Sequence, residues 1–174
     1  MKILVTGAAG FIGKNLMEAL GRNGDRQVWE FTRNSSEAEL RAALAEVDLV
    51  YHLAGENRPA DPQQFEETNV GLTVKILELL ADLKRRPAIV FASSIQAQQD
   101  NPYGRSKRAA EEKLRQFAQA SGARVVAYRL KNVFGKWSRP NYNSVVATFC
   151  HNIARELTIT ISDPNRVLDL VYID

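Results

Sequence analysis

A glycine-rich turn directly after a short apolar segment is the feature that most constrains the fold of this 174-residue chain. Residues 2–6 are typical of a buried strand, and Gly7, Gly10 and Gly13 follow at three-residue intervals before a helical pattern begins. Glycine permits a tight turn and close backbone approach to a diphosphate, and the start of the helix offers free N–H groups. After an N-terminal strand, this pattern predicts a dinucleotide cradle that includes Phe11 and Ile12.

Apolar runs alternate with helical patterns along the first part of the chain. Strands are expected at residues 2–6, 27–32, 48–54, 88–93 and 124–130. Helices are expected from the glycine turn to about residue 24 and over residues 37–46, 62–83 and 103–120. Strands that alternate with helices pair in parallel through right-handed crossovers. The sequence therefore predicts an α/β fold with a doubly wound, parallel, Rossmann-like sheet and helices on both faces.

The pattern changes after residue 132, which indicates a second part of the chain. We expect a polar, aromatic loop at 135–143, a helix at 144–157 and strands at 158–161 and 167–173. The predicted domains are a nucleotide-binding domain at residues 1–134 and the start of a substrate-binding region at 135–174. Unsupported apolar surface near residues 167–173 is expected to favour self-association. A homodimer or a higher homo-oligomer is also expected.

The carboxyl ends of parallel strands form the edge at which such folds bind ligands. The residues at the expected strand ends are Gly7, Thr32, Ala54, Ser94 and Leu130. These residues are therefore expected to lie along one rim of the sheet.

Tyr103 and Lys107 are four residues apart in an expected helix and so lie on one face of it. A nearby positive charge lowers the pKa of a phenol, which would make Tyr103 a usable general acid or base. Ser94 could hydrogen-bond the reacting oxygen. An exposed tyrosine and a solvated lysine on a surface helix are the alternative for an isolated pair, and the remaining motifs favour the catalytic interpretation.

The end of the second strand predicts the choice of cofactor. An NAD site places an acidic residue at this tip, whereas Thr32 and Arg33 stand there and suit a 2′-phosphate. Glu30 is the competing residue, but alternation places it inside the strand. The sequence therefore favours NADP(H).

Composition excludes several classes of function. The net charge is only +3 and the basic residues are scattered, so nucleic-acid binding is not expected. His52 is interpreted as a core histidine, and with two histidines and Cys150 as the single cysteine the chain has no zinc-site pattern and no internal disulfide. No apolar run is long enough to span a membrane and no signal peptide is visible, so we expect a cytoplasmic protein without membrane partners.

Together these motifs resemble the extended short-chain dehydrogenase/reductase superfamily, whose members act mostly on nucleotide sugars. The matching segments are residues 6–13, 52–55, Asn69, Ser93, Ser94, Tyr103, Lys107 and Arg129 to Gly135. The resemblance implies that Ser94, Tyr103 and Lys107 are catalytic and that Lys107 also holds the nicotinamide ribose. It also implies that Leu53, Ala54, Gly55 and Leu130 contact the cofactor.

Residues 55–59, 135–144 and 149–154 resemble more narrowly the capsular-polysaccharide UDP-sugar reductases. That resemblance implies NADPH-dependent reduction of a C4 ketone in the synthesis of UDP-N-acetyl-L-fucosamine, with a nucleotide-sugar substrate. It implies that substrate contacts come from Asn57, Arg58, Ser94, Asn132, Arg139 and Asn143. Asn132 as a local cap and residues 136–143 as an ordinary loop remain the alternatives.

Members of this narrower family continue into a metal-binding cupin that epimerises C3, so the chain is expected to correspond to their reductase part, without a metal site. A 4,6-dehydratase is excluded because Ile95 and Gln96 stand where those enzymes carry Asp-Glu. A 4-epimerase with tightly bound NAD and a non-catalytic NADP sensor remain the alternative functions.

Overall fold

A computed structural model describes residues 1–22, 24–59, 61 and 63–174 of the chain. The residues form two compact units, Met1–Leu130 and Lys131–Asp174. The domain boundary predicted after residue 134 remains a prediction about the whole protein. No helix of the described residues is both long and apolar enough to cross a membrane.

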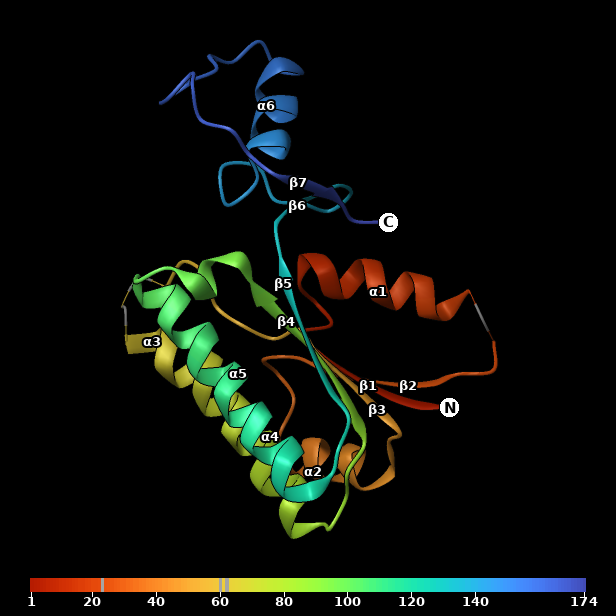
Figure 1. Cartoon of the computed structure of the whole chain (residues 1–174). Helices are drawn as coiled ribbons and strands as arrows, with labels where there is room; N and C mark the ends of the chain where they lie inside the picture. Colours follow the sequence, from red (N-terminus) through yellow and green to blue (C-terminus); the bar gives the residue numbers. More distant parts are fainter. Residues whose placement is uncertain (23, 60, 62) are drawn as a thin grey trace. The chain divides into compact units, whose positions relative to one another are not determined.

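The first unit is built on a five-stranded parallel sheet in the order β2-β1-β3-β4-β5 (Figure 1). Its strands are β1 (Lys2–Thr6), β2 (Gln27–Phe31), β3 (Leu49–His52), β4 (Ala88–Ser94) and β5 (Val125–Leu130). Its helical segments are α1 (Phe11–Gly21), α2 (Glu37–Glu46), α3 (Gln63–Phe65), the π-helical η1 (Glu66–Gly71), α4 (Leu72–Asp82), the 3-10 helix η2 (Ile95–Gln98) and α5 (Pro102–Ser121). The predicted Rossmann-like fold is confirmed. The predicted helix at 62–83 begins at Pro62, which lies outside the described residues.

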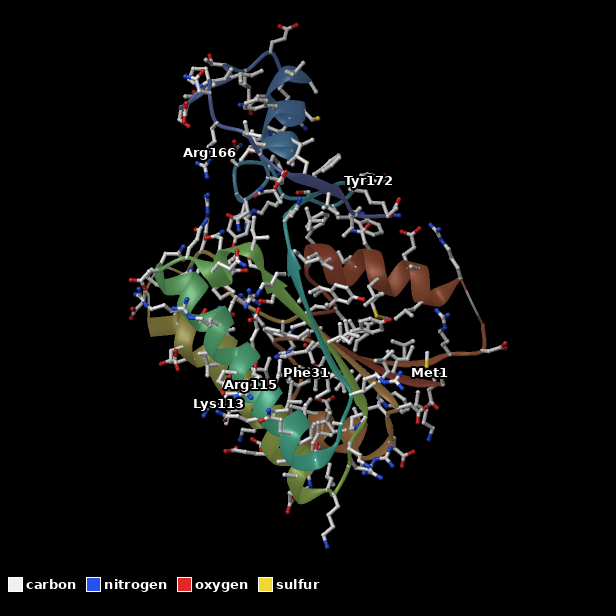
Figure 2. All side chains as sticks on the ribbon, viewed as in Figure 1. Met1, Phe31, Lys113, Arg115, Arg166 and Tyr172 are labelled. Atoms are coloured by element: carbon white, nitrogen blue, oxygen red, sulfur yellow. The ribbon has the colours of Figure 1, made fainter. Side chains whose placement is uncertain are left out.

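The sheet separates two apolar clusters, one on each face. Alternate residues of β1 face opposite sides, so Leu4 packs with α2, α4 and α5 whereas Ile3 and Val5 pack with α1. Figure 1 shows α1 on one side of the sheet and α2, α4 and α5 on the other. Figure 2 shows side chains filling the space between the strands and these helices. Burial on both faces explains why the centre of β1, Ile3 to Val5, is a continuous apolar run.

Local signals determine where the helices begin and end. The α2 helix begins with a capping box, in which Ser36 and Glu39 hydrogen-bond each other's backbone N–H groups. The α5 helix begins at Pro102 after Asn101, whose side chain accepts a hydrogen bond from the Gly104 N–H at 2.7 Å. It ends at Gly122, which has a φ of 74°. These caps hold α5, the helix that carries Tyr103 and Lys107, at a defined position along β4.

The second unit contains α6 (Val145–Ile153) and a two-stranded parallel sheet of β6 (Asn132–Phe134) and β7 (Leu170–Tyr172). The predicted helix at 144–157 is shorter than expected, because Glu156 takes a left-handed φ of 57° in the turn after it. The strand predicted at 158–161 is wrong, because these exposed residues have no ladder partner among the described residues. The short strand β6 was not predicted. It exists only through pairing with β7, which is distant in sequence.

Candidate functional site

The glycine turn has the geometry that a diphosphate requires. Gly7 has a φ of 71°, and a Cβ there would lie 2.7 Å from the Ala54 backbone nitrogen. A Cβ on Gly13 would lie 2.2 Å from the Gly7 carbonyl oxygen. Side chains are therefore excluded from both positions, and the backbone stays open to a ligand.

The N terminus of α1 lies at this turn and begins at Phe11. Its N-cap residue is Gly10, which has no side chain that could cap the helix. The first turn of α1 carries no acidic side chain. Backbone N–H groups and the positive end of the helix dipole are therefore available to an anion. Phe11 and Ile12 lie in this first turn, as the sequence predicted. The residues present fit the diphosphate of a dinucleotide.

The segment after β3 lies directly against the glycine turn. Leu53 and Ala54 contact Gly7, and a Cβ on Gly55 would lie 2.9 Å from Asn69 Oδ1 and 3.0 Å from Lys107 Nζ. Asn69 holds this segment through two hydrogen bonds to Glu56, accepting from its N–H at 2.8 Å and donating to its carbonyl at 2.9 Å. Gly55 therefore brings the predicted cofactor site against the predicted catalytic lysine.

A chain of buried side-chain hydrogen bonds connects β1, β3 and α4 to this segment. Thr73 Oγ1 donates to the Asn69 carbonyl at 2.7 Å, so it accepts from His52 Nε2 at 2.9 Å. His52 Nδ1 then accepts from Thr6 Oγ1 at 2.8 Å, and Thr6 Oγ1 accepts from the Ala54 N–H at 3.2 Å. The network assigns His52 as a neutral ring with its proton on Nε2.

Burial, reinforced by the charge of Lys107, lowers the pKa of His52 to about 3. The imidazole is 1% exposed and both of its nitrogens are satisfied. The interpretation of His52 as a core histidine is confirmed.

The structure brings Ser94 and Tyr103 together. Ser94 is the last residue of β4 and Tyr103 lies in the first turn of α5, and the two side chains share a hydrogen bond. Gly104 permits this approach, because a Cβ there would lie 2.1 Å from the Gln96 carbonyl oxygen. The close packing of α5 on η2 therefore places the phenol at the end of β4.

Lys107 lies one turn further along α5 and is 4% exposed. Its ammonium donates to the Ala92 carbonyl at 2.9 Å and lies 4.9 Å from the centre of the Phe91 ring and 5.9 Å from that of Tyr103. Burial lowers the pKa of Lys107 to about 8, and the nearby charge of Glu111 acts in the opposite direction. Lys107 is therefore charged at neutral pH, but it loses its proton at a lower pH than a surface lysine does.

The prediction that Lys107 lowers the pKa of Tyr103 is wrong for this structure. Burial raises the pKa of Tyr103, and the hydrogen bond with Ser94 only partly opposes the effect. The Lys107 ammonium is instead directed at the Ala92 carbonyl. Tyr103 is therefore a protonated phenol, suited to donate a proton.

The tip of β2 carries Arg33 in a tight turn. The Thr32 N–H donates to Ser35 Oγ at 3.1 Å, which fixes the turn, and the Arg33 side chain is 86% exposed. Arg33 Nη2 donates to Glu56 Oε2 at 2.7 Å, across to the segment after β3. Glu30 lies inside β2, as predicted. Arg33 therefore lies beside the cradle with its guanidinium accessible.

The residues predicted to bind substrate fall into two groups. Asn57 and Arg58 follow Glu56, whose Oε1 accepts hydrogen bonds from both of their N–H groups at 3.1 and 3.3 Å. Ser94, the third member of this first group, ends β4 in register with Leu130 of β5, a predicted cofactor contact. The second unit contains the remaining members, Asn132, Arg139 and Asn143.

Two of these second-unit residues have partners of their own. Asn132 donates from its backbone N–H and from Nδ2 to the Asp169 carbonyl, both at 3.2 Å. The Arg139 guanidinium lies 5.4 Å from the centre of the Tyr142 ring. The assignment of Asn132, Arg139 and Asn143 to a substrate pocket remains a prediction. No group of three or more His, Cys, Asp or Glu side chains in the described part of the chain could hold a metal ion.

Sequence reasoning missed the role of several residues that support the site. Ser106 accepts from Asn69 Nδ2 at 2.9 Å and donates to the Tyr103 carbonyl at 2.8 Å, which joins η1 to the start of α5. Glu111 pairs with Arg129 on β5. The helical spacing of Tyr103, Lys107 and Glu111 was the available signal for Glu111, since the three share one face of α5.

The fold, the glycine turn and the Ser94–Tyr103–Lys107 cluster define a dinucleotide-binding α/β protein of the short-chain dehydrogenase/reductase type. The chain belongs to the NAD dependent epimerase/dehydratase family, whose model matches residues 3–174.

Among known proteins, the chain is 50% identical over 174 residues to the UDP-2-acetamido-2,6-beta-L-arabino-hexul-4-ose reductase of Pseudomonas aeruginosa, covering all of this chain and 47% of that protein. It is 28% identical over 227 residues to UDP-glucuronate 4-epimerase 1 of Arabidopsis thaliana, covering all of this chain and 52% of that enzyme. The chain thus spans about half the length of these relatives.

A crystal structure of the capsular polysaccharide assembling protein CapF from Staphylococcus aureus matches with a TM-score of 0.88 and 47% identity, over 99% of this chain and 47% of that one. A UDP-glucuronic acid 4-epimerase from Bacillus cereus in complex with NAD matches with a TM-score of 0.87 and 24% identity, over 99% of this chain and 70% of that one. The second match shows the fold alone.

The buried state of His52 predicts a pH dependence of stability. The unfolded chain protonates His52 near pH 6.5, whereas the folded chain resists protonation until about pH 3. The stabilisation is complete above that unfolded-state value and is lost as the pH falls below it. The free energy of unfolding in urea should therefore fall between about pH 7 and about pH 5.5.

The slope should largely disappear in His52→Gln and persist in His151→Gln, which removes the other histidine of the sequence. An equal slope in His52→Gln and in the unmodified chain would contradict a buried, neutral His52.

Proposed function

We propose that this chain is the reductase part of a protein that uses NADPH to reduce the C4 ketone of a UDP-4-keto-6-deoxy-N-acetylhexosamine. The product would serve capsular or O-antigen polysaccharide synthesis as a precursor of the UDP-N-acetyl-L-fucosamine type. The observation that carries the proposal is the hydrogen-bonded Ser94–Tyr103 pair with the buried Lys107 ammonium one turn away. The 50% identity to a UDP-sugar reductase supports the same substrate class. We also propose a cytoplasmic homodimer or higher homo-oligomer.

In the proposed reaction, Tyr103 donates its proton to the C4 oxygen while Ser94 hydrogen-bonds that oxygen. A reduced nicotinamide cofactor, held at the glycine turn and by Lys107, would supply a hydride to the C4 carbon and leave as the oxidised cofactor. The raised pKa of Tyr103 suits this direction, because the phenol keeps its proton until the ketone oxygen acquires negative charge. Lys107 then stabilises the tyrosinate that remains, since its ammonium lies 5.9 Å from the ring centre.

A 4-epimerase with tightly bound NAD is the second candidate, favoured by the 28% identity to a UDP-glucuronate 4-epimerase. The two candidates share the roles of Ser94 and Tyr103 and differ in whether the cofactor is consumed. A non-catalytic NADP sensor has no use for a hydrogen-bonded Ser94–Tyr103 pair.

Replacement of Tyr103 by Phe tests the proton donor. It removes the hydroxyl but keeps the ring that packs 5.8 Å from Phe65, so the cofactor site should be preserved. Turnover, measured as NADPH oxidation with a UDP-4-keto-6-deoxy-N-acetylhexosamine, should fall by about 100-fold or more. The dissociation constant for NADPH should stay nearly unchanged.

Tyr128→Phe is the matched control, because Tyr128 is 57% exposed on β5, and its turnover should be that of the unmodified protein. Near-normal turnover in Tyr103→Phe would refute the assignment.

Arg33 supports the preference for NADPH over NADH. A 2′-phosphate would take the Arg33 guanidinium, whose side chain is 86% exposed, from Glu56. Since a charge-assisted contact contributes roughly 1.5–3 kcal/mol, Arg33→Ala should weaken NADPH binding by about 10- to 100-fold. NADH binding, measured by the same fluorescence titration, should change little.

Arg22→Ala removes another exposed arginine, at the C-terminal end of α1, and should leave both affinities unchanged. Equal affinity of the unmodified protein for NADH and NADPH would show that the interpretation of the β2 tip is wrong.

A further inference from the structure

Glu111 connects three elements beside the proposed reaction site. It lies one turn beyond Lys107 on α5, and its side chain is 15% exposed. Arg129 on β5 donates to both of its oxygens, from Nε at 3.0 Å and from Nη2 at 2.6 Å. Ser93 Oγ on β4, the residue before Ser94, donates to the same carboxylate. Glu111 is therefore ionised: burial opposes ionisation, but the hydrogen bonds from Arg129 and Ser93 lower its pKa.

The groups around Lys107 leave its charge poorly compensated. On α5 these are the Tyr103 phenol and the Glu111 carboxylate, on β3 the neutral His52 ring, and on β4 the Phe91 ring and the Ala92 carbonyl. The hydrogen bond to Ala92 is made to a neutral oxygen. Lys107 donates to the Ala92 carbonyl and Glu111 accepts from the next residue, Ser93, so the two side chains reach consecutive residues of β4 without pairing directly. From this place the Glu111 carboxylate supplies a negative charge that opposes the effect of burial on the ammonium.

We propose that Glu111 is a positioning residue that keeps the Lys107 ammonium charged, and that Arg129 limits this effect by pairing with the carboxylate. The inference gives Ser93 and Arg129, which the sequence singled out without a role, a function beside the catalytic cluster. It rests on the proposed catalytic role of Lys107, but the charge of Lys107 can be measured without any reaction.

A purely mechanical role for the ion pair makes a different prediction. The pair also ties α5 to β5, so if its only role were to hold these elements, removal of either member would disturb Lys107 in the same way. An electrostatic role requires opposite effects. Removal of the carboxylate takes a negative charge from the surroundings of Lys107, whereas removal of the guanidinium leaves that negative charge unpaired.

The test is an NMR titration of the ¹³Cε resonance of Lys107 in the chain without ligands, assigned by its absence in Lys107→Arg. In the unmodified chain the pKa should be about 8. Glu111→Gln should lower it by roughly half a unit to one unit, and Arg129→Gln should raise it.

Glu112→Gln is the matched control. It removes the neighbouring carboxylate, which pairs with the exposed Arg115 labelled on α5 in Figure 2, and it should leave the pKa of Lys107 unchanged. Glu111→Asp keeps the charge and should restore most of the value lost in Glu111→Gln. Glu111→Gln removes the charge and nearly keeps the shape, whereas Glu111→Asp keeps the charge and shortens the side chain. Comparison of the two separates loss of charge from loss of shape.

The proposal is overturned if Glu111→Gln leaves the pKa of Lys107 unchanged, or if Arg129→Gln lowers it as Glu111→Gln does. If Glu111→Gln does not fold, two measurements still test the proposal. The pKa of Lys107 should rise in Arg129→Gln and should stay near its unmodified value in Glu111→Asp.

A kinetic measurement links the pair to the proposed reaction. In Glu111→Gln the alkaline limb of the kcat/KM profile should move to lower pH by the shift that NMR measures. The two conclusions can fail separately. If the pKa of Lys107 shifts in Glu111→Gln but the unmodified protein shows no turnover, the proposed function is refuted and the effect of Glu111 on the charge of Lys107 still holds.

Discussion

The buried ammonium of Lys107 is the interaction on which the rest of the proposed site depends. A buried charge is costly unless polar groups compensate it. The hydrogen bond from the Lys107 ammonium to the Ala92 carbonyl therefore fixes α5 at one position along β4. Helix geometry then carries Tyr103 to Ser94 at the end of the strand. The charge is only moderately stabilised, so neighbouring groups such as Glu111 can tune it.

Close backbone approaches at glycine make this arrangement possible. Gly7 contacts the backbone after β3, Gly55 contacts Lys107, and Gly104 packs α5 against η2. A side chain at any of these positions would force apart elements that carry the glycine turn or the Ser94–Tyr103–Lys107 cluster. The hydrogen bonds on both nitrogens of the buried His52 support the same region from the interior. Because the ring is buried, its pKa is lowered and it resists protonation.

Much of the first unit could be predicted from the sequence, because β1 to β5 and their helices follow local periodicity and caps. The glycine turn and the Tyr103–Lys107 spacing likewise depend on neighbours in the chain. Features that depend on distant pairing could not be predicted. Examples are β6, which exists only beside β7, and the bond between Glu111 and Arg129 across two elements. The direction of the Tyr103 pKa was missed because burial, which dominates it, is a property of the fold.

Transfer of deuterium from reduced, deuterated NADPH to the sugar tests the central claim most directly. The account predicts that a UDP-4-keto-6-deoxy-N-acetylhexosamine gains one deuterium at C4, with one NADPH oxidised for each sugar reduced. Interconversion of the C4 epimers of a UDP sugar without net oxidation of the cofactor, and without deuterium at C4, would contradict it and identify an epimerase.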